Sequence, residues 1–245
     1  YFFLLVCQFS GYMLVRPLVS LQDTPTVIEE MLNEFEATVQ AECEQVFITL
    51  HLDNASYFTS NEVSERMAKR RVHLHWAAPY DPRTNCYAER YGGVLVVGTR
   101  SMLLEGSYPS RFWSVIVRVA CWIINRMVRK KGKAPIEKLL PEGGDDLLDF
   151  SKVHPTGTLC YWHVPKEDCD DPKWGSTSSI GVYIGPGEAF GKRGYMVYTA
   201  NDRLRTVSHA LVMIGNQISS LLIAQWTRTD WAASSMRDTS SMMNL

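Results

Sequence analysis

The stretch Val46-Phe-Ile-Thr-Leu-His-Leu-Asp53-Asn-Ala-Ser-Tyr-Phe-Thr-Ser60 joins an apolar run to an acid. The run from Val46 to Leu52 predicts a buried strand, and Asp53 stands at its C-terminal end, where open α/β sheets commonly place ligands. Thr59 and Glu62 have the spacing of a helix capping box, so we expect a short helix soon after the acid. The stretch therefore predicts an α/β unit with Asp53 at the ligand-binding edge of its sheet.

A second acid, Glu89, opens a predicted helix after the proline-containing segment 78–84. We expect that segment to be a mobile surface loop, because it holds two prolines and few apolar residues. Taken singly, an acid at a strand end or in the first turn of a helix is an ordinary surface residue that the helix dipole favours. Only the sequence around each acid can therefore indicate that the two acids belong to one site.

The first 140 residues alternate strand and helix patterns, which predicts an α/β domain over 1–140. Residues 1–8 and 11–19 are rich in β-branched and aromatic side chains, as in a hairpin. Thr26 and Glu29 have capping-box spacing and predict the start of a helix that runs to Val39. Further predicted elements are a strand over 72–77, the helix that Glu89 opens, and a long helix capped by Ser110.

The composition changes after residue 140. Residues 141–151 are rich in proline, glycine and acids, and we interpret them as a linker. Short apolar runs separated by glycines then predict a small all-β domain over 152–215. Residues 216–245 lose this periodicity and are predicted to be a poorly ordered tail.

The segments around the two acids resemble the integrase of copia-type long-terminal-repeat retrotransposons, a Pol polyprotein product. That family places one metal-binding acid in Ser-Asp-Asn-Gly-x-Glu-Phe-Thr-Ser and another in Pro-Tyr-Thr-Pro-Gln-Gln-Asn-Gly-Val-Ala-Glu-Arg. The likeness spans about residues 1 to 215 and includes Gly132-Lys-Ala-Pro135. The shared residues are Asp53, Asn54, Phe58, Thr59, Ser60, Pro79, Tyr80, Pro82, Asn85, Ala88, Glu89 and Arg90.

The resemblance implies a fold and an activity. The fold is a ribonuclease-H-like α/β core, with a mixed five-stranded sheet flanked by helices, followed by a small β-barrel of the Src-homology-3 kind. The activity is DNA integration by metal-dependent polynucleotidyl transfer, meaning 3′-end processing and strand transfer. Asp53 and Glu89 would be the catalytic acids and would bind Mg²⁺ or Mn²⁺. Expected partners are the element ends, target DNA and further copies of the chain; the residues implied in nucleic-acid contact are Asn54, Asn85, Arg90, Lys130 and Lys131.

One acid of the family's trio is missing, because its first metal-binding Asp aligns with Cys7. A thiol has an unperturbed pKa of about 8.5, so it is mostly neutral at pH 7, and as a soft ligand it suits zinc better than Mg²⁺. Gly92 and Gly93 also replace the family's Asn and Arg on the helix of Glu89, and each glycine costs about 1 kcal/mol relative to alanine there. Our hypothesis is that catalysis by this copy is impaired.

Whether the chain is an enzyme therefore stays open, and the alternative is a non-catalytic nucleic-acid-binding or assembly module derived from an integrase. The formal net charge of −1 provides no overall attraction to DNA, so DNA contact would need local basic patches. Two basic runs, 126–133 and 69–71, are candidates for such patches. Stabilisation of helix C-termini explains both runs equally well.

Other sequence patterns indicate the cellular compartment of the protein and the classes of partner it lacks. The six cysteines include no Cys-x-x-Cys, which predicts reduced thiols in a nuclear or cytoplasmic protein rather than a secreted one. The apolar opening is too short to span a bilayer, and we expect neither a membrane partner nor a small-molecule substrate. For His154, Cys160, His163 and Cys169, strand alternation is favoured over a zinc site because their spacing matches no standard zinc pattern.

Overall fold

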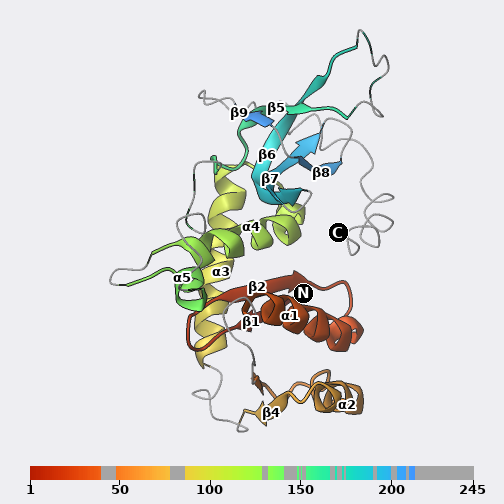
Figure 1. Ribbon diagram of the computed structural model, residues 1–245, viewed down its shortest axis with the longest axis vertical. Helices are drawn as coiled ribbons and strands as arrows, with labels where there is room; N and C mark the ends of the chain where they lie inside the picture. The colour runs from red at the N-terminus through yellow and green to blue at the C-terminus, as the bar shows by residue number, and fades with distance from the viewer. Residues whose placement is uncertain are drawn as a thin grey trace. The chain divides into compact units, whose positions relative to one another are not determined.

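A computed structural model describes residues 1–39, 48–77, 86–128, 132–140, 148, 150, 153–165, 169, 173, 175–189, 192–199, 203–207 and 210–212 (Figure 1). The chain divides into two compact units. Unit 1 comprises Tyr1–Ser101 and Phe112–Phe150, and unit 2 comprises Met102–Arg111 and Ser151–Leu245. The domain bounds expected from the sequence remain a prediction.

Unit 1 opens with the predicted hairpin, which the structure confirms. Strand β1 (Phe2–Val6) pairs antiparallel with β2 (Met13–Pro17). The backbone N–H of Cys7 donates to Tyr12 O at 2.8 Å, and the N–H of Gly11 donates to Cys7 O at 2.8 Å. Gly11 adopts a φ of 77°, a left-handed conformation that favours glycine, so the hairpin closes at this residue.

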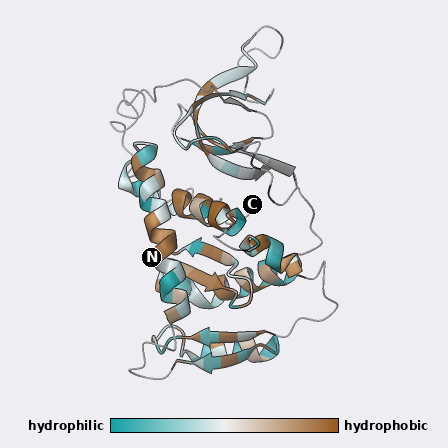
Figure 2. Cartoon of the chain, turned by 90° about the vertical axis from the view of Figure 1, so that its left-hand side faces the viewer, coloured by the Kyte–Doolittle hydropathy of each residue, from teal (hydrophilic) through white to brown (hydrophobic). Residues whose placement is uncertain are grey.

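Helices cover both faces of the hairpin. Side chains alternate between the two faces of a strand, so Phe3 and Leu14 share one face, and these pack with residues of α1 (Thr24–Val39). The other face carries Phe2, whose ring lies 6.5 Å from that of Trp113 in α4 (Trp113–Arg126). Figure 2 shows hydrophobic residues along the hairpin and along the helices that pack on it. The hairpin is therefore the middle layer of an α/β/α arrangement.

The start of α1 differs from the predicted one. The capping box is formed by Ser20 and Asp23 around the 3₁₀ turn η1 (Leu21–Asp23), and α1 begins directly after it. Thr26 and Glu29, the predicted box, lie inside the helix, so that prediction was wrong. Ser20 has extended backbone angles and its side chain accepts from Gln22 N, which is the geometry that a capping residue requires.

A second, parallel pair follows, formed by β3 (Thr49–Leu52) and β4 (His73–Trp76) with α2 (Asn61–Lys69) between them. The predicted start of β3, residues 46 and 47, lies outside the described residues. The cap of α2 is Ser60 rather than the predicted Thr59, because Ser60 Oγ accepts from Val63 N at 3.4 Å. The predicted strand over 72–77 is confirmed.

The described elements between β4 and the sheet of unit 2 are helical. Helix α3 (Cys86–Glu105) begins near Glu89 as predicted and continues through its glycines. Ser110 was predicted to cap the next helix, which is wrong: Ser110 begins the 3₁₀ turn η3 (Ser110–Phe112), and α4 has no side-chain cap. Helix α5 (Pro135–Leu139) places its proline at the first turn, where no backbone donor is needed.

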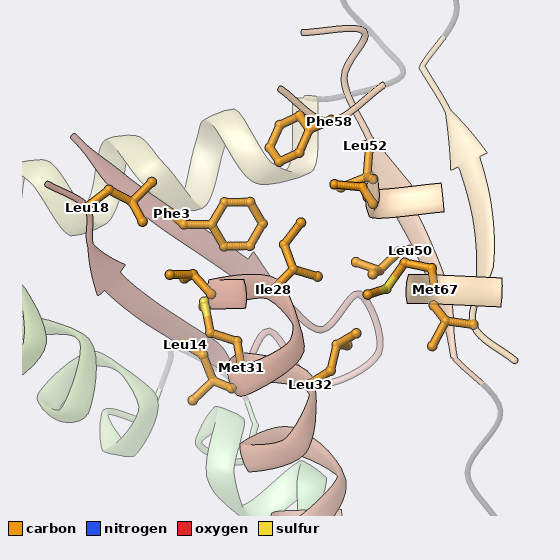
Figure 3. Close-up of a cluster of buried hydrophobic side chains, with 13 residues drawn as sticks. Phe3, Leu14, Leu18, Ile28, Met31, Leu32, Leu50, Leu52, Phe58 and Met67 are labelled. Carbon is orange, nitrogen blue, oxygen red and sulfur yellow. The ribbon is translucent and has the colours of Figure 1, made fainter. Parts of the chain in front are cut away.

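The predicted five-stranded mixed sheet is not confirmed. The described part of unit 1 holds two separate two-stranded sheets, β1–β2 and β3–β4. Side chains join them instead, because Phe3 and Leu14 of the hairpin share one buried cluster with Leu50 and Leu52 of β3 (Figure 3). The α/β class stands, while the sheet composition differs from the expectation.

Unit 2 is built around one antiparallel sheet. Its strands are β5 (Leu159–His163), β6 (Ser178–Ala189), β7 (Lys192–Thr199), β8 (Leu204–Val207) and β9 (Ala210–Val212). Their order is β8-β7-β6-β5-β9, a meander whose last strand returns beside the first. The all-β prediction is thus supported for this sheet, whereas closure into a barrel is not confirmed.

Candidate metal and nucleic-acid site

Cys7 lies directly after β1, where the hairpin turn begins. The thiol is half-buried, and the residue is fixed by the two backbone hydrogen bonds that close the turn. The position that the resemblance assigns to the missing acid therefore has a defined backbone conformation.

The first turns of α3 pack against this hairpin turn through two tyrosines. Tyr87 Oη donates to Gln8 O at 2.9 Å, and its ring centroid lies 4.8 Å from that of Tyr91. A Cβ added to Gly11 would lie 2.4 Å from Tyr91 Oη, so the backbone and the ring are in close contact. Neither tyrosine was predicted to contribute to the site, although their i, i+4 spacing is a signal for one helix face.

Glu89 is exposed in the first turn of α3. A helix turns about 100° per residue, so Glu89 lies on the side of α3 opposite the one that carries Tyr87 and Tyr91. Arg90 is also exposed. The contact between helix and hairpin thus fixes the helix start, while the acid itself faces away from that contact.

Asp53 is half-buried directly after β3. Its Oδ1 accepts from Ala55 N at 3.1 Å, a local turn that orients the carboxylate. The neighbouring Asn54 donates through Nδ2 to Ala77 O at 2.7 Å and so ties the end of β3 to the end of β4. Tyr57 lies close enough to Asp53 that burial first and the Asp53 charge second raise the pKa of Tyr57.

The three positions belong to one unit, but the structure does not gather them into a metal site. Phe3 of β1 and Phe58 of the segment after Asp53 form an edge-on ring pair with centroids 5.6 Å apart (Figure 3). Within the described residues, no group of three or more His, Cys, Asp or Glu side chains lies together in a way that could hold a metal ion. The roles of Asp53 and Glu89 as ligands therefore stay a prediction.

The residues implied in nucleic-acid contact divide into two sets. Asn54 and Arg90 are exposed, whereas Asn85, Lys130 and Lys131 lie outside the described residues. In the basic run 69–71, Arg70 pairs with Glu36 of α1, Nη2 to Oε2, at 2.7 Å. The Arg126 guanidinium lies 3.9 Å from the Trp122 ring centroid. Both of these arginines thus make structural contacts within unit 1.

Two of the four histidines and cysteines weighed as zinc ligands, Cys160 and His163, lie in strand β5. Cys160 is 1% exposed and His163 is exposed, so these neighbours on β5 face opposite sides of the sheet. The His154 ring stacks on Tyr195 with centroids 6.3 Å apart. Strand alternation, the favoured interpretation, therefore accounts for Cys160 and His163, whereas His154 and Cys169 lie outside the strands.

No family model matches the chain. It is 30% identical over 173 residues to a retrovirus-related Pol polyprotein from transposon TNT 1-94 of Nicotiana tabacum, a match that covers 69% of this chain and 13% of that protein. The chain thus spans about an eighth of the length of this curated relative.

In the described residues, no helix has both the length and the apolar character needed to cross a membrane.

Two solved structures are similar to the chain. One is the catalytic core domain of BIV integrase, with 17% identity, a TM-score of 0.44, and coverage of 57% of this chain and 85% of that one. The other is a simian T-cell lymphotropic virus intasome in complex with PP2A regulatory subunit B56 gamma, with 14% identity, a TM-score of 0.47, and coverage of 88% and 73%. From the sequence match and the motifs around its two acids, this chain is a relative of the integrase region of copia-type retrotransposon Pol polyproteins.

Proposed function

We propose that the chain forms the ribonuclease-H-like core and following β-domain of a retrotransposon integrase whose ancestral metal site retains Asp53 and Glu89 but has Cys7 in place of its first Asp. DNA ends, target DNA and further copies of the chain are the partners. The observation that carries the proposal is the sequence match to a transposon Pol polyprotein together with the motifs around Asp53 and Glu89. The contact of Tyr87 with Gln8 holds the helix of Glu89 against the turn that begins at Cys7, although the Glu89 side chain lies on the opposite side of that helix.

The donor set does not fit two Mg²⁺ ions. When bound, such ions would stabilise charge on the attacking and leaving oxygens of a phosphodiester, and Mg²⁺ prefers hard oxygen ligands. Asp53 and Glu89 supply carboxylates, whereas the Cys7 thiol is a soft ligand that suits zinc better than Mg²⁺. We therefore infer that polynucleotidyl transfer by this copy is severely impaired.

A second candidate function is a non-catalytic nucleic-acid-binding or assembly module. The replacement of the acid at Cys7 favours it, since the loss of one ligand removes chemistry but leaves the fold intact. The exposed Asn54 and Arg90 would contact DNA in both cases. Binding that weakens steeply with salt, without metal-dependent cleavage, distinguishes this module from an enzyme.

The test restores the missing acid. Strand transfer of short DNA ends is measured with Mg²⁺ for the wild type, for Cys7→Asp and for the uncharged isostere Cys7→Asn. We expect activity from Cys7→Asp alone, because only this variant supplies the third carboxylate. The further changes Asp53→Asn and Glu89→Gln, each made in the Cys7→Asp chain, should abolish the recovered activity.

Two results would contradict the proposal. Wild-type strand transfer that is lost on Asp53→Asn would show that Cys7 does not impair the site. Recovered activity in Cys7→Asp that survives Glu89→Gln would remove Glu89 from the site. If Cys7→Asp stays inactive but binds DNA in a salt-dependent manner, the non-catalytic module is the function that remains.

A further inference from the structure

The outer face of the β3–β4 pair carries histidines that the proposed function does not use. Leu50 and Leu52 face the buried cluster, so the alternate residues of β3 face outward. His51 is exposed on this outer face, and His73 and His75 are exposed on the same face of β4. In Figure 2 hydrophilic residues alternate with hydrophobic ones along the two strands at the bottom of the view.

The register places two of these imidazoles directly side by side. His51 and His75 are partners across the parallel ladder, and their ring centroids are 4.6 Å apart with the ring planes inclined at 44°. His73 is opposite Thr49 instead, so it has no histidine partner across the strands. The parallel pairing of β3 with β4 therefore creates one imidazole pair, and His73 serves as an internal comparison.

This spacing matches shared coordination of one ion. A zinc ion about 2.0 to 2.1 Å from one nitrogen of each ring, with tetrahedral angles, sets the ring centroids about 5 Å apart. The observed 4.6 Å needs only a small adjustment of exposed side chains. The two ring planes are inclined and not stacked face to face. In a face-to-face stack the nitrogens of the two rings would point in parallel directions and would not converge on one ion.

We propose that His51 and His75 form a surface site for a divalent transition-metal ion such as Zn²⁺, with water completing the coordination. Imidazole suits zinc, copper and nickel, whereas Mg²⁺ selects carboxylates and water. The site is therefore distinct in chemistry from the ancestral Mg²⁺ site and does not depend on the proposed function. Because its two ligands lie on different strands, the bound ion links β3 to β4 just before Asp53.

The experiment titrates the full chain with Zn²⁺ and records heat of binding and thermal unfolding. A ligand that binds only the folded state raises the melting temperature, by about 5 °C at a hundredfold excess over the dissociation constant for a chain of this size. We expect this rise in the wild type and in His73→Ala. We expect its loss, with at least a tenfold weaker affinity, in His51→Ala and in His75→Ala.

Two further measurements make the result decisive. Without metal, His51→Gln and His75→Gln should melt at the wild-type temperature, which shows that lost binding is not lost folding. Co²⁺ used as a spectroscopic probe should give ligand-field bands without thiolate charge-transfer bands, because the ligands are imidazoles. A wild type that does not bind Zn²⁺, equal binding by His51→Ala, or thiolate bands that persist in His75→Ala would each overturn the proposal.

Discussion

Asn125 of α4 pairs with the backbone of Met13 through both ends of its side-chain amide. Its Oδ1 accepts from Met13 N at 2.8 Å, and its Nδ2 donates to Met13 O at 2.7 Å. Met13 is 0% exposed and Asn125 is 3% exposed, so water does not replace these bonds. The amide therefore satisfies the outer edge of β2 as a neighbouring strand would.

We expect Asn125→Ala to lower the free energy of unfolding by about 2 kcal/mol, because it leaves the buried Met13 N–H without a partner, while Met13 O keeps only the weak Cys121 Sγ donor at 3.3 Å. Urea unfolding followed by circular dichroism measures this loss. Asn61→Ala, at an exposed position, is the matched control and should change stability by less than about 0.5 kcal/mol. Equal effects of the two substitutions would mean that the amide contact contributes nothing.

Gly93 offers a stabilising change. A Cβ at this position meets nothing within 4 Å, and Gly93 lies in the interior of α3, so Gly93→Ala should raise the free energy of unfolding by about 1 kcal/mol. Gly157→Ala should act oppositely, because Gly157 has a φ of +94° and its added Cβ would lie 2.8 Å from Gly106 Cα. Chemical denaturation of both variants checks the two signs, and a destabilised Gly93→Ala would contradict the open space seen beside α3.

Arg70 joins α2 to α1 and should matter for stability rather than for DNA. Its Nη1 donates to Asn33 Oδ1 at 2.5 Å and its Nη2 to Glu36 Oε2 at 2.7 Å. Arg70→Gln should cost about 1 kcal/mol at low salt and less at high salt, as expected for a partly exposed ion pair. Lys69→Gln, at an exposed neighbour, should leave the urea midpoint unchanged. A salt-independent loss in Arg70→Gln would assign the effect to packing.

Thiol reactivity should separate the cysteines by burial. Burial raises the pKa of Cys121 and of Cys160 to about 12, so few thiolates form at pH 8. Cys86, by contrast, is exposed at the start of α3. Alkylation followed by peptide mapping should label Cys86 at least about 100-fold faster than the two buried thiols, which react only on unfolding. Fast labelling of Cys160 in the folded chain would show that the core of unit 2 opens.

Tyr12 should make the fold sensitive to alkali. Burial, followed by the nearby Glu34 charge, raises its pKa from 10.0 to about 12. The folded chain thus holds this proton more tightly than the unfolded chain, and the resulting stability is present below pH 10 and is lost as pH rises towards 12. Tyr12→Phe has no such proton, so its stability relative to the wild type should rise by about 2 to 3 kcal/mol over that window. Parallel curves of unfolding free energy against pH would contradict the shift.

Local sequence patterns predicted most of the elements, because the period of apolar residues is imposed by each element's own geometry. The hairpin, α1, β3, β4 and α3 all formed near their predicted positions. The capping residues at the helix starts were predicted less accurately. Ser20 with Asp23 and Thr26 with Glu29 both have capping spacing, and only the backbone angles at Ser20 distinguish the real box.

The residues of the candidate site could be predicted from the sequence, whereas their positions relative to one another could not. The motifs around Asp53 and Glu89 identified the family, since they are contiguous strings. No local motif predicts that Tyr91 contacts Gly11 or that Tyr87 donates to Gln8 O, because the residues of each pair are far apart along the chain. The side of α3 on which Glu89 lies was consequently unknown until the helix was packed.

The sequence by itself determined the family, and it predicted the α/β and all-β halves and the replacement of an acid by Cys7. Tertiary structure alone decided which strands pair, that Asn125 caps the edge of β2, and that His51 meets His75. The physical reason is the separation along the chain over which each interaction acts. Apolar periodicity and helix caps act within a few residues. Strand pairing and packing depend on which distant surfaces together bury the most apolar area and leave the fewest polar groups without partners.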